Sequence, residues 1–318
     1  QEALDLMKKA GARIVDENRV HNPPHLVEWA LSRVPKQIRI CDRRGQPKMA
    51  LERNNVYFGS GSDCTYVLDH HTGERLPGSM DYLEKGIRVC DALPNIDFVM
   101  SLCAPAEIKD ADLGNRFQMR SMLKNTIKPI VFVTLGFESC KDVIKMAEVV
   151  AGGPEDLAKN PSCINYVNYA HPLKHNGDSL LKLLYAAEKG LPSIYCTSVD
   201  GGASGPVTPA GGFALSNAGD LVGVVLAQLK REGAPVIPGA YHMNFSMNFN
   251  KGVISEAPRT MGARSELAHF QGLPTFGWGG VSGSKMIDQQ AGAQIALSLI
   301  TEAISGTNLI HDVGYLGG

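Results

Sequence analysis

Short apolar runs alternate with amphipathic helical stretches along most of the chain, and this alternation is what most limits the possible folds. Each run is rich in β-branched and aromatic residues and is followed by a loop, a helix and a break of Gly, Pro or Asn. Runs of this kind predict parallel strands that are covered by helices. The runs lie at residues 56–58, 96–100, 130–134, 164–167, 193–196, 235–237, 274–276 and 308–310.

Eight strands with intervening helices predict a (β/α)8 TIM barrel, an α/β fold that usually takes about 250 residues. The rival fold is a doubly wound open sheet, which calls for a dinucleotide-binding fingerprint after the first strand. The sequence there, Gly59-Ser60-Gly61-Ser62-Asp63, is not G-x-G-x-x-G, so the barrel is favoured. We expect the eighth helix to lie beyond Gly318, so that this chain wraps the barrel incompletely.

The first 53 residues do not follow the alternation, and they predict an N-terminal cap ahead of a barrel domain at 54–318. A short helix is expected over 2–9. A second helix opens after Pro23-Pro24 and ends at Pro35. Residues 38–41 and 49–51 flank Arg44-Gly45, which favours a small hairpin.

Charge and cysteine usage exclude several classes of partner. Lys+Arg is 31 against Asp+Glu 32, so there is no electrostatic reason to expect nucleic acid or a membrane. No apolar run reaches the ~18 residues of a spanning helix, and the charged N-terminal stretch is unlike a secretory signal. The seven cysteines and nine histidines show no zinc-site spacing. We therefore expect a cytoplasmic protein with reduced thiols and no bound metal.

The carboxyl ends of barrel strands form the active site, so the residues that follow each run are the candidates. Aromatic residues make up 7% of the chain, yet several fall at these positions, whereas basic residues are almost absent there. Aromatic faces without Lys or Arg suit a cationic ligand, above all a quaternary ammonium, which cannot donate a hydrogen bond. The predicted cation site contains Trp278, Phe276, Tyr241 and Tyr169. The alternative is packing, with Phe276 filling the barrel and Tyr169 lying beneath a lid.

Polar residues at the same strand ends are candidates for orienting a substrate. His311, His242 and Asn168 are the catalytic candidates, and His171, Asp312 and Lys285 are further substrate-binding candidates. Lys285 follows a Gly-rich loop, where it meets a carboxylate or caps the loop. A lyase or aldolase with Lys285 or Lys174 as a Schiff base is a weaker enzymatic alternative. Residues 200–209 predict a mobile loop at the mouth rather than a phosphate site, because they lack G-K-[ST].

Several long segments resemble one known family in the same order. They are NNVYFGSGSDCTYVLDHHTGERLPG, ALPNIDFVMS, GGASGPVTPAGGFALSNAGDLVGVVLAQLKREGAPVIPGAYH, RSELAHFQGLPTFGWGG and SGSKMIDQQAGAQIA. They resemble the trimethylamine methyltransferase (MttB) superfamily over nearly the whole chain. The resemblance implies a (β/α)8 barrel and the transfer of a methyl group from a methylated amine to the cobalt of a separate corrinoid protein. It implies no cofactor in this chain, since the corrinoid (cobalamin) is carried by the partner, and we expect a homo-oligomer.

The resemblance also bears on the substrate. Archaeal trimethylamine enzymes of this family carry pyrrolysine, which does not occur in this sequence. The chain therefore resembles the branch whose members demethylate quaternary amines such as glycine betaine. Two alternatives stay open: a trimethylamine or other methylamine methyltransferase, and a non-catalytic paralogue that binds quaternary amines.

Overall fold

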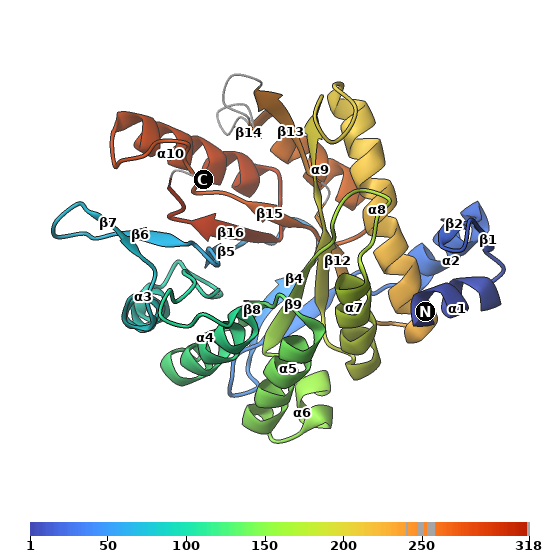
Figure 1. Ribbon diagram of the computed structural model, residues 1–318, viewed down its shortest axis with the longest axis horizontal. Helices are drawn as coiled ribbons and strands as arrows, with labels where there is room; N and C mark the ends of the chain where they lie inside the picture. The colour runs from blue at the N-terminus through green and yellow to red at the C-terminus, as the bar shows by residue number, and fades with distance from the viewer. Residues whose placement is uncertain (240, 247–250, 253–257, 317–318) are drawn as a thin grey trace.

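Parallel strands form the wall of a barrel, and helices cover its outer side (Figure 1). The structure is a computed structural model that describes residues 1–239, 241–246, 251–252 and 258–316, with the backbone alone for 242–246, 251–252 and 258–259. The strands of the wall are β5 (Tyr57–Ser60), β8 (Ile130–Val133), β9 (Cys163–Asn168), β10 (Ser193–Cys196), β12 (Val236–Pro238), β15 (Phe276–Trp278) and β16 (Leu309–Val313). The helices outside it are α3 (Met80–Ala92), α4 (Ala111–Asn125), α5 (Phe137–Ala151), α6 (Pro154–Lys159), α7 (Gly177–Lys189), α8 (Pro209–Lys230), α9 (Pro258–Phe270) and α10 (Gln289–Ile304).

Two parallel sheets make most of the wall, with the strand orders β12-β10-β9-β8 and β15-β16-β5. Where β12 approaches β15, the hydroxyl of Thr275 donates to the carbonyl oxygen of Pro238 at 3.4 Å. At the other junction, the predicted strand 96–100 lies between β5 and β8. The predicted (β/α)8 barrel is therefore confirmed, with strands and helices alternating in chain order.

The predicted strand at 96–100 is shorter than its apolar run suggests. Isolated parallel bridges join Phe98 to β5 and Val99 to β8. The Asp97 carboxylate accepts a hydrogen bond from the backbone N–H of Phe58 at 2.8 Å. A side chain of the 96–100 segment thus takes the place of a backbone acceptor for this β5 donor, which explains why a regular ladder does not form there.

Side chains along each wall strand alternate between the interior and the helical layer. On β9, Ile164 and Tyr166 pack in the interior cluster, whereas Val167 packs with Val224 of α8 in an outer cluster. This is the period of two that a strand imposes. Apolar residues fill the interior below Tyr166, so a ligand site is expected above it, at the carboxyl ends of the strands.

The N-terminal residues close the opposite end of the barrel. The elements there are α1 (Glu2–Lys9), β1 (Arg13–Val15), β2 (Arg19–His21), α2 (Pro24–Arg33), β3 (Ile38–Cys41) and β4 (Pro47–Leu51). Ile40, Met49 and Leu51 of the β3–β4 hairpin pack in the interior cluster with Phe98. The predicted helices and this hairpin are confirmed, and the β1–β2 hairpin was not predicted. Helices α1 and α2 pack against α8 of the barrel. The predicted domain boundary at residue 53, between an N-terminal cap and the barrel, therefore stays a prediction.

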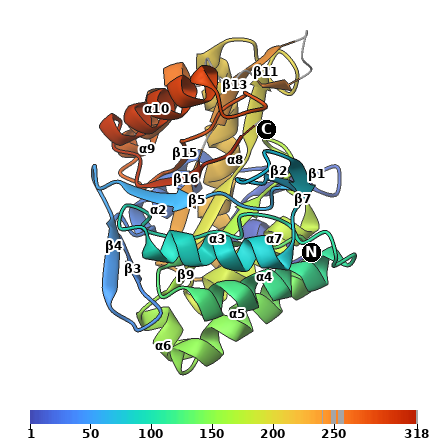
Figure 2. The same cartoon turned by 90° about the vertical axis from the view of Figure 1, so that its left-hand side faces the viewer.

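Short strands also surround the mouth, and the sequence pattern did not predict them. They are β6 (Tyr66–Leu68), β7 (Arg75–Pro77), β11 (Ser198–Gly201), β13 (Tyr241–Ser246) and β14 (Lys251–Gly252). Figure 2 shows the β3–β4 hairpin and the strands β11 and β13 on different sides of the molecule. Part of the Gly-rich segment 200–209 is β11 and a tight turn, in which the backbone N–H of Gly202 donates to Gly205 at 3.0 Å.

Helix α8 lies so close to the wall that it requires glycine at its contacts. A Cβ at Gly223 would lie 2.2 Å from the ring of Tyr195, and one at Gly219 would lie 2.4 Å from the hydroxyl of Tyr169. Among the described helices, α8 is the one long and apolar enough to cross a membrane, with 56% of the relevant window buried. The expectation that no stretch would reach this length is thus corrected, and the burial is that of a helix that covers a barrel.

We expect Gly223→Ala to destabilise the protein by about 1–3 kcal/mol, because the added methyl group overpacks the contact with the Tyr195 ring. The matched control is Gly292→Ala on α10, where no atom lies within 4 Å of the new Cβ. The control should be neutral or stabilising by up to about 1 kcal/mol, since alanine favours the helix. Urea unfolding of the two variants measures the difference. Equal effects of both substitutions would contradict this account of the α8 contact.

Candidate functional site

Aromatic side chains gather at the carboxyl ends of the strands, inside the barrel. Tyr166, Tyr241, Phe276 and Trp278 all pack in or against the interior cluster. The ring of Phe276 is fully buried and stacks on His311, with centroids 4.2 Å apart, and the ring of Tyr166 lies 5.2 Å from Phe276. Trp278 is partly exposed. Phe276 therefore forms the floor of the mouth, and Trp278 stands above it.

Two of these assignments differ from the sequence-based prediction. Tyr166 was not predicted, although its place two residues before Asn168 puts both on the interior face of β9. Tyr169 points the other way: its ring is 2% exposed and stacks on Tyr195 at 4.7 Å. Its hydroxyl donates to Asp220 of α8 at 2.6 Å. The packing alternative therefore describes the position of the Tyr169 ring, and a role for Tyr169 in a cation site stays a prediction, because Tyr169 also lines the adjoining cavity.

Two carboxylates stand at neighbouring strand ends, Asp63 after β5 and Asp312 on β16. Both have left-handed backbone conformations, with φ 56° and 71°, as does Leu102 with φ 61°. Non-glycine residues held in this region are strained, and such strain clusters at functional sites. Asp63 accepts hydrogen bonds from the hydroxyl of Ser101 at 2.8 Å and from the amide of Gln118 at 2.9 Å. The structure thus holds Asp63 in a fixed position, a role that the sequence did not reveal.

Burial determines the ionisation of this pair. Loss of solvent raises the pKa of Asp63 above its usual value, while the hydrogen bonds from Ser101 and Gln118 act in the opposite direction. Burial also raises the pKa of Asp312, which His311 lowers and the charge of Asp63 raises further. A cation that entered the mouth would favour the charged form of both carboxyl groups.

His311 is held by its neighbours. It is 7% exposed, its Nδ1 lies 2.6 Å from the carbonyl oxygen of Gly277, and its Nε2 lies 3.2 Å from Oδ2 of Asp312. The carbonyl acceptor places a proton on Nδ1. The imidazole thus stacks on Phe276 and lies beside the Asp312 carboxyl group.

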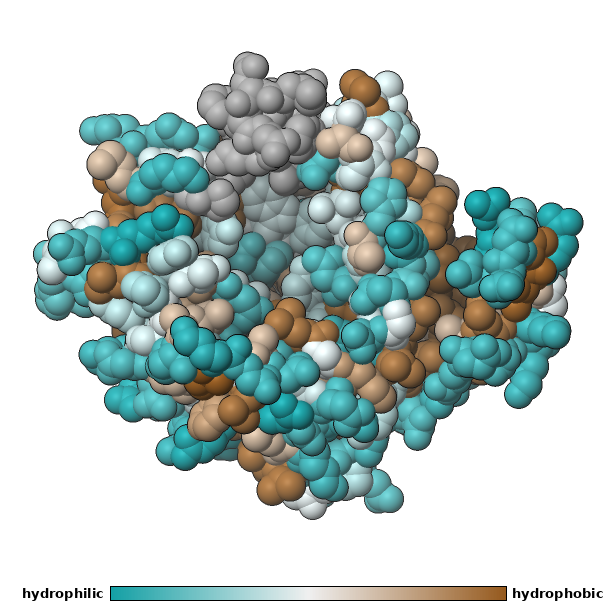
Figure 3. Space-filling model, in the orientation of Figure 1, coloured by the Kyte–Doolittle hydropathy of each residue, from teal (hydrophilic) through white to brown (hydrophobic). Residues whose placement is uncertain are grey.

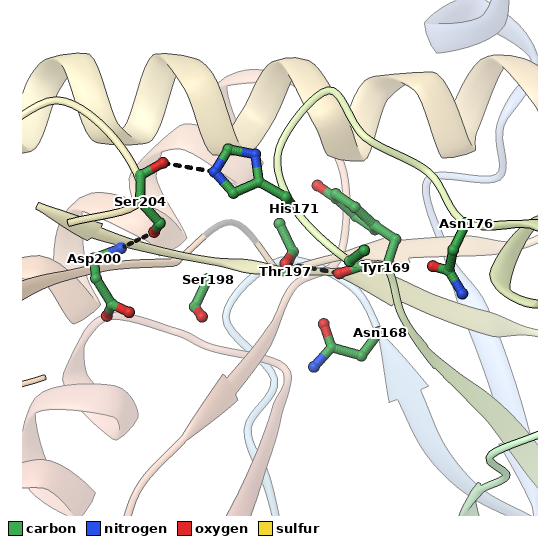
Figure 4. A pocket seen from close by; sticks show the side chains of 9 residues that line it. Asn168, Tyr169, His171, Asn176, Thr197, Ser198, Asp200 and Ser204 are labelled. Carbon is green, nitrogen blue, oxygen red and sulfur yellow. Dashed lines mark hydrogen bonds between the residues drawn. The ribbon is translucent and has the colours of Figure 1, made fainter. Parts of the chain in front are cut away.

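A cavity of about 620 Å³ adjoins the mouth above β9 and β10. It is lined by Asn168, Tyr169, Ala170, His171, Asn176, Thr197, Ser198, Asp200 and Ser204. Figure 4 shows Asn168, Ser198 and Asp200 pointing away from α8, and His171 lying beside Ser204. The two ring nitrogens of His171 lie 2.7 Å from the carbonyl oxygen of Pro172 and 2.6 Å from that of Ser204. His171 thus links the two loops that border the cavity.

The surface is hollowed at this end of the barrel. Figure 3 shows a hollow between α10 and α8 whose visible lining is pale or teal, so polar residues are prominent there. Asn168 and His171 line the cavity, and their roles toward a substrate stay predictions. Lys285 is exposed in the loop before α10, and Lys174 is exposed in the loop after β9. The side chain of His242 lies outside the described residues. In the part of the chain that the structure describes, no group of three or more His, Cys, Asp or Glu is arranged to hold a metal ion.

Helix α8 supports the mouth from outside through two polar residues one turn apart. Ser216 accepts a hydrogen bond from the backbone N–H of Tyr241 at 3.1 Å and donates to the carbonyl oxygen of Thr197 at 3.3 Å. Asp220 accepts from the backbone N–H of Gly239 at 3.1 Å. Both residues are buried. They fix the backbone from which Tyr241 extends.

The buried His175, which lies next to Tyr195, should make the free energy of unfolding depend on pH. Its Nδ1 lies 2.7 Å from the Tyr195 hydroxyl, its Nε2 is buried without a hydrogen-bond partner, and burial lowers its pKa to about 4. The unfolded chain therefore binds a proton between about pH 6.5 and 4 that the folded chain does not. The stability that the neutral His175 contributes is complete above about pH 6.5 and is lost as the pH falls toward 4. From pH 7 to pH 5 we expect a loss of roughly 1–2 kcal/mol that His175→Gln abolishes.

Urea unfolding at the two pH values measures this loss, and His70→Gln, in the exposed turn between β6 and β7, serves as the control. The same decrease in wild type and His175→Gln would show that His175 is not its source.

Comparison with known proteins places the chain in a family. Residues 1–318 match the family model described as trimethylamine methyltransferase (MTTB). A glycine betaine methyltransferase from Desulfitobacterium hafniense (strain Y51) is 29% identical over 321 residues, which cover 99% of this chain and 66% of that protein. Trimethylamine methyltransferase MttB from Methanosarcina barkeri is 27% identical over 331 residues, covering 99% of this chain and 65% of that protein. The chain thus spans slightly less than two thirds of the length of these curated relatives.

Solved structures agree on the fold. Dihydropteroate synthase from Xanthomonas albilineans has a TM-score of 0.50 at 11% identity and covers 83% of this chain and 89% of that chain. The synthase from Coxiella burnetii has a TM-score of 0.51 at 11% identity and covers 88% and 93%. At this identity the likeness concerns the barrel alone. The family model, by contrast, matches the whole sequence, and the chain therefore belongs to the trimethylamine methyltransferase (MTTB) family.

Proposed function

We propose that this chain is a cytoplasmic enzyme that transfers a methyl group from a quaternary ammonium compound to the Co(I) of a separate corrinoid protein. Glycine betaine is the substrate named for one relative, and trimethylamine for another. The observation that carries the proposal is the mouth itself, where aromatic faces and two carboxylates converge above a closed interior. A homo-oligomer remains part of the proposal.

The chemistry makes modest demands on the protein. The bond between nitrogen and the methyl carbon breaks as the carbon–cobalt bond forms, the electron pair of the broken bond stays on nitrogen, and the amine leaves neutral. No proton has to be transferred. The protein must bind the cation, aim one methyl group outward and exclude water, and such orientation supplies up to about 7–11 kcal/mol in the best cases.

The described residues supply these functions. Trp278, Tyr166 and Tyr241 offer aromatic faces to the cation, above the floor made by Phe276. Asp312, which lies beside His311, adds negative charge next to them when it is ionised. Asn168, at the end of β9, points toward the adjoining cavity and is placed to contact the rest of the substrate.

A spectroscopic assay tests the proposal. Purified protein is mixed with glycine betaine, choline or trimethylamine and a corrinoid protein reduced to Co(I), and the conversion of the Co(I) spectrum to that of the methylated form is followed. We expect conversion with a quaternary amine that depends on this protein. Tight binding of such an amine by calorimetry without any methylation would instead favour the non-catalytic binding paralogue.

A further inference from the structure

Acidic groups surround the mouth on several sides. Asp63 follows β5, Asp312 lies on β16, and Asp200 lines the cavity beside β10. Asp63 and Asp312 are close enough that the charge of Asp63 raises the pKa of Asp312. Asp312 also lies next to the aromatic set, because Nε2 of His311 is 3.2 Å from its Oδ2 and the His311 ring lies 4.2 Å from Phe276 and 6.1 Å from Tyr166. The aromatic faces and the carboxylates thus belong to one site.

Two buried basic side chains near the mouth are held by other protein groups, and the exposed Lys285 lies in the loop between β15 and α10. Arg264 is buried and paired with Glu302 behind β15, and its guanidinium carbon lies 5.1 Å from the centre of the Tyr241 ring. Lys182 is buried in the helical layer, where its ammonium donates to the carbonyl oxygen of Thr134 at 2.6 Å. The residues that line the cavity include neither Lys nor Arg. His311 is the neighbour whose charge favours ionisation of Asp312.

Hydrogen-bond donors at the mouth are largely directed to protein acceptors as well. Ser101 and Gln118 donate to Asp63, and the hydroxyl of Tyr241 donates to the carbonyl oxygen of Phe276 at 3.4 Å. In the cavity, the neutral Asn168 and Ser198 stand beside Asp200. Among the residues that line the cavity, a carboxylate on a substrate would therefore meet Asp200 and neutral groups, and no guanidinium or ammonium group.

We infer that the mouth selects quaternary ammonium compounds of net positive charge over zwitterions that carry their own carboxylate. This inference rests on the proposed function and narrows its substrate class. Both classes present the same trimethylammonium group to the aromatic faces. The zwitterion alone brings a negative charge close to Asp312 and Asp63, and like charges held near each other in a partly buried site repel strongly.

Calorimetry on the full chain with two matched ligands tests this inference. Glycine betaine and glycine betaine amide have nearly the same shape, but the first is a zwitterion and the second is a cation. We expect the amide to bind at least about tenfold more tightly at low salt, with the preference reduced as ionic strength rises. The variant Asp312→Asn should reduce the preference to less than about threefold, because it removes the repelling charge.

The variants are chosen so that the backbone is preserved. Asn tolerates the left-handed conformation of Asp312 better than most residues do. Asp63→Asn is the second variant, should Asp312→Asn fold poorly. The control is Asp16→Asn, which replaces another aspartate of positive φ (48°) at an exposed turn between β1 and β2, and it should keep the full preference.

Each outcome decides a separate question. Glycine betaine bound as tightly as its amide, or a preference that both variants leave unchanged, would overturn the inference and leave the proposed methyl transfer standing. If neither ligand bound and neither methylated the corrinoid protein, the proposed function would fail, and the inference with it.

Discussion

Glu302→Ala is expected to destabilise the protein by about 3–5 kcal/mol, the largest effect on stability that we predict for a single substitution. Arg264 and Glu302 are 2% and 0% exposed, and Nη2 of Arg264 donates to both carboxylate oxygens. Removing Glu302 leaves the guanidinium charge buried without its counter-ion. Urea unfolding at neutral pH measures the loss, which in the extreme appears as a failure to fold.

Two controls separate the buried pair from salt bridges in general. Glu138→Ala removes an exposed carboxylate that lies 2.7 Å from Lys141, and it should cost less than about 1 kcal/mol. The double replacement of Arg264 and Glu302 by Met should be less damaging than Glu302→Ala, because no unpaired charge remains. If Glu302→Ala behaved like Glu138→Ala, the assignment of a buried, unsolvated ion pair would be wrong.

Trp278→Ala is expected to weaken the binding of a quaternary ammonium ligand by about 30-fold. Trp278 stands at the carboxyl end of β15, partly exposed and packed against the interior cluster. A desolvated contact between a cation and an indole is worth about 2 kcal/mol, and each 1.4 kcal/mol is about tenfold in affinity. Calorimetry with tetramethylammonium, which offers no other polar group, isolates this contribution.

A conservative replacement should distinguish the contribution of the aromatic face of Trp278 to ligand affinity from the effect of losing side-chain volume. Trp278→Phe keeps an aromatic face and should lose less than about tenfold. Trp29→Phe, on α2 in an outer cluster, changes the chain's other tryptophan and should leave the affinity unaltered. Unchanged binding by Trp278→Ala would remove this ring from the site.

The barrel was predictable because each wall strand is buried on both faces, so its sequence is a short apolar run whatever its neighbours are. The position of Trp278 at a strand end followed from the same rule. The packing of Tyr169 against Tyr195 and Asp220 could not be predicted, because successive side chains of a strand face opposite sides. Asn168 and Tyr169 both follow the predicted run, and only the observed end of β9 shows which of them faces inward.

The support of the mouth could not be predicted from the sequence. Asp63 depends on a positive φ and on Gln118, which is 55 residues away along the chain. In the sequence, Asp220 is one polar residue within the apolar helix α8. Its hydrogen bonds with Tyr169 and Gly239 form only when α8 packs against the barrel strands. Local patterns determine which face of an element is buried, but not which distant groups become hydrogen-bond partners.

The β3–β4 hairpin bears on the order in which a substrate and an acceptor protein would bind. Since Ile40, Met49 and Leu51 plug one end of the barrel, the described structure leaves the opposite end as the route for exchange. Under the proposed function, a small amine and a methyl acceptor carried by another protein would then both reach the site through the same end of the barrel. Under the proposed function, the amine would therefore bind before the acceptor protein docks, and the demethylated product would leave after the acceptor dissociates.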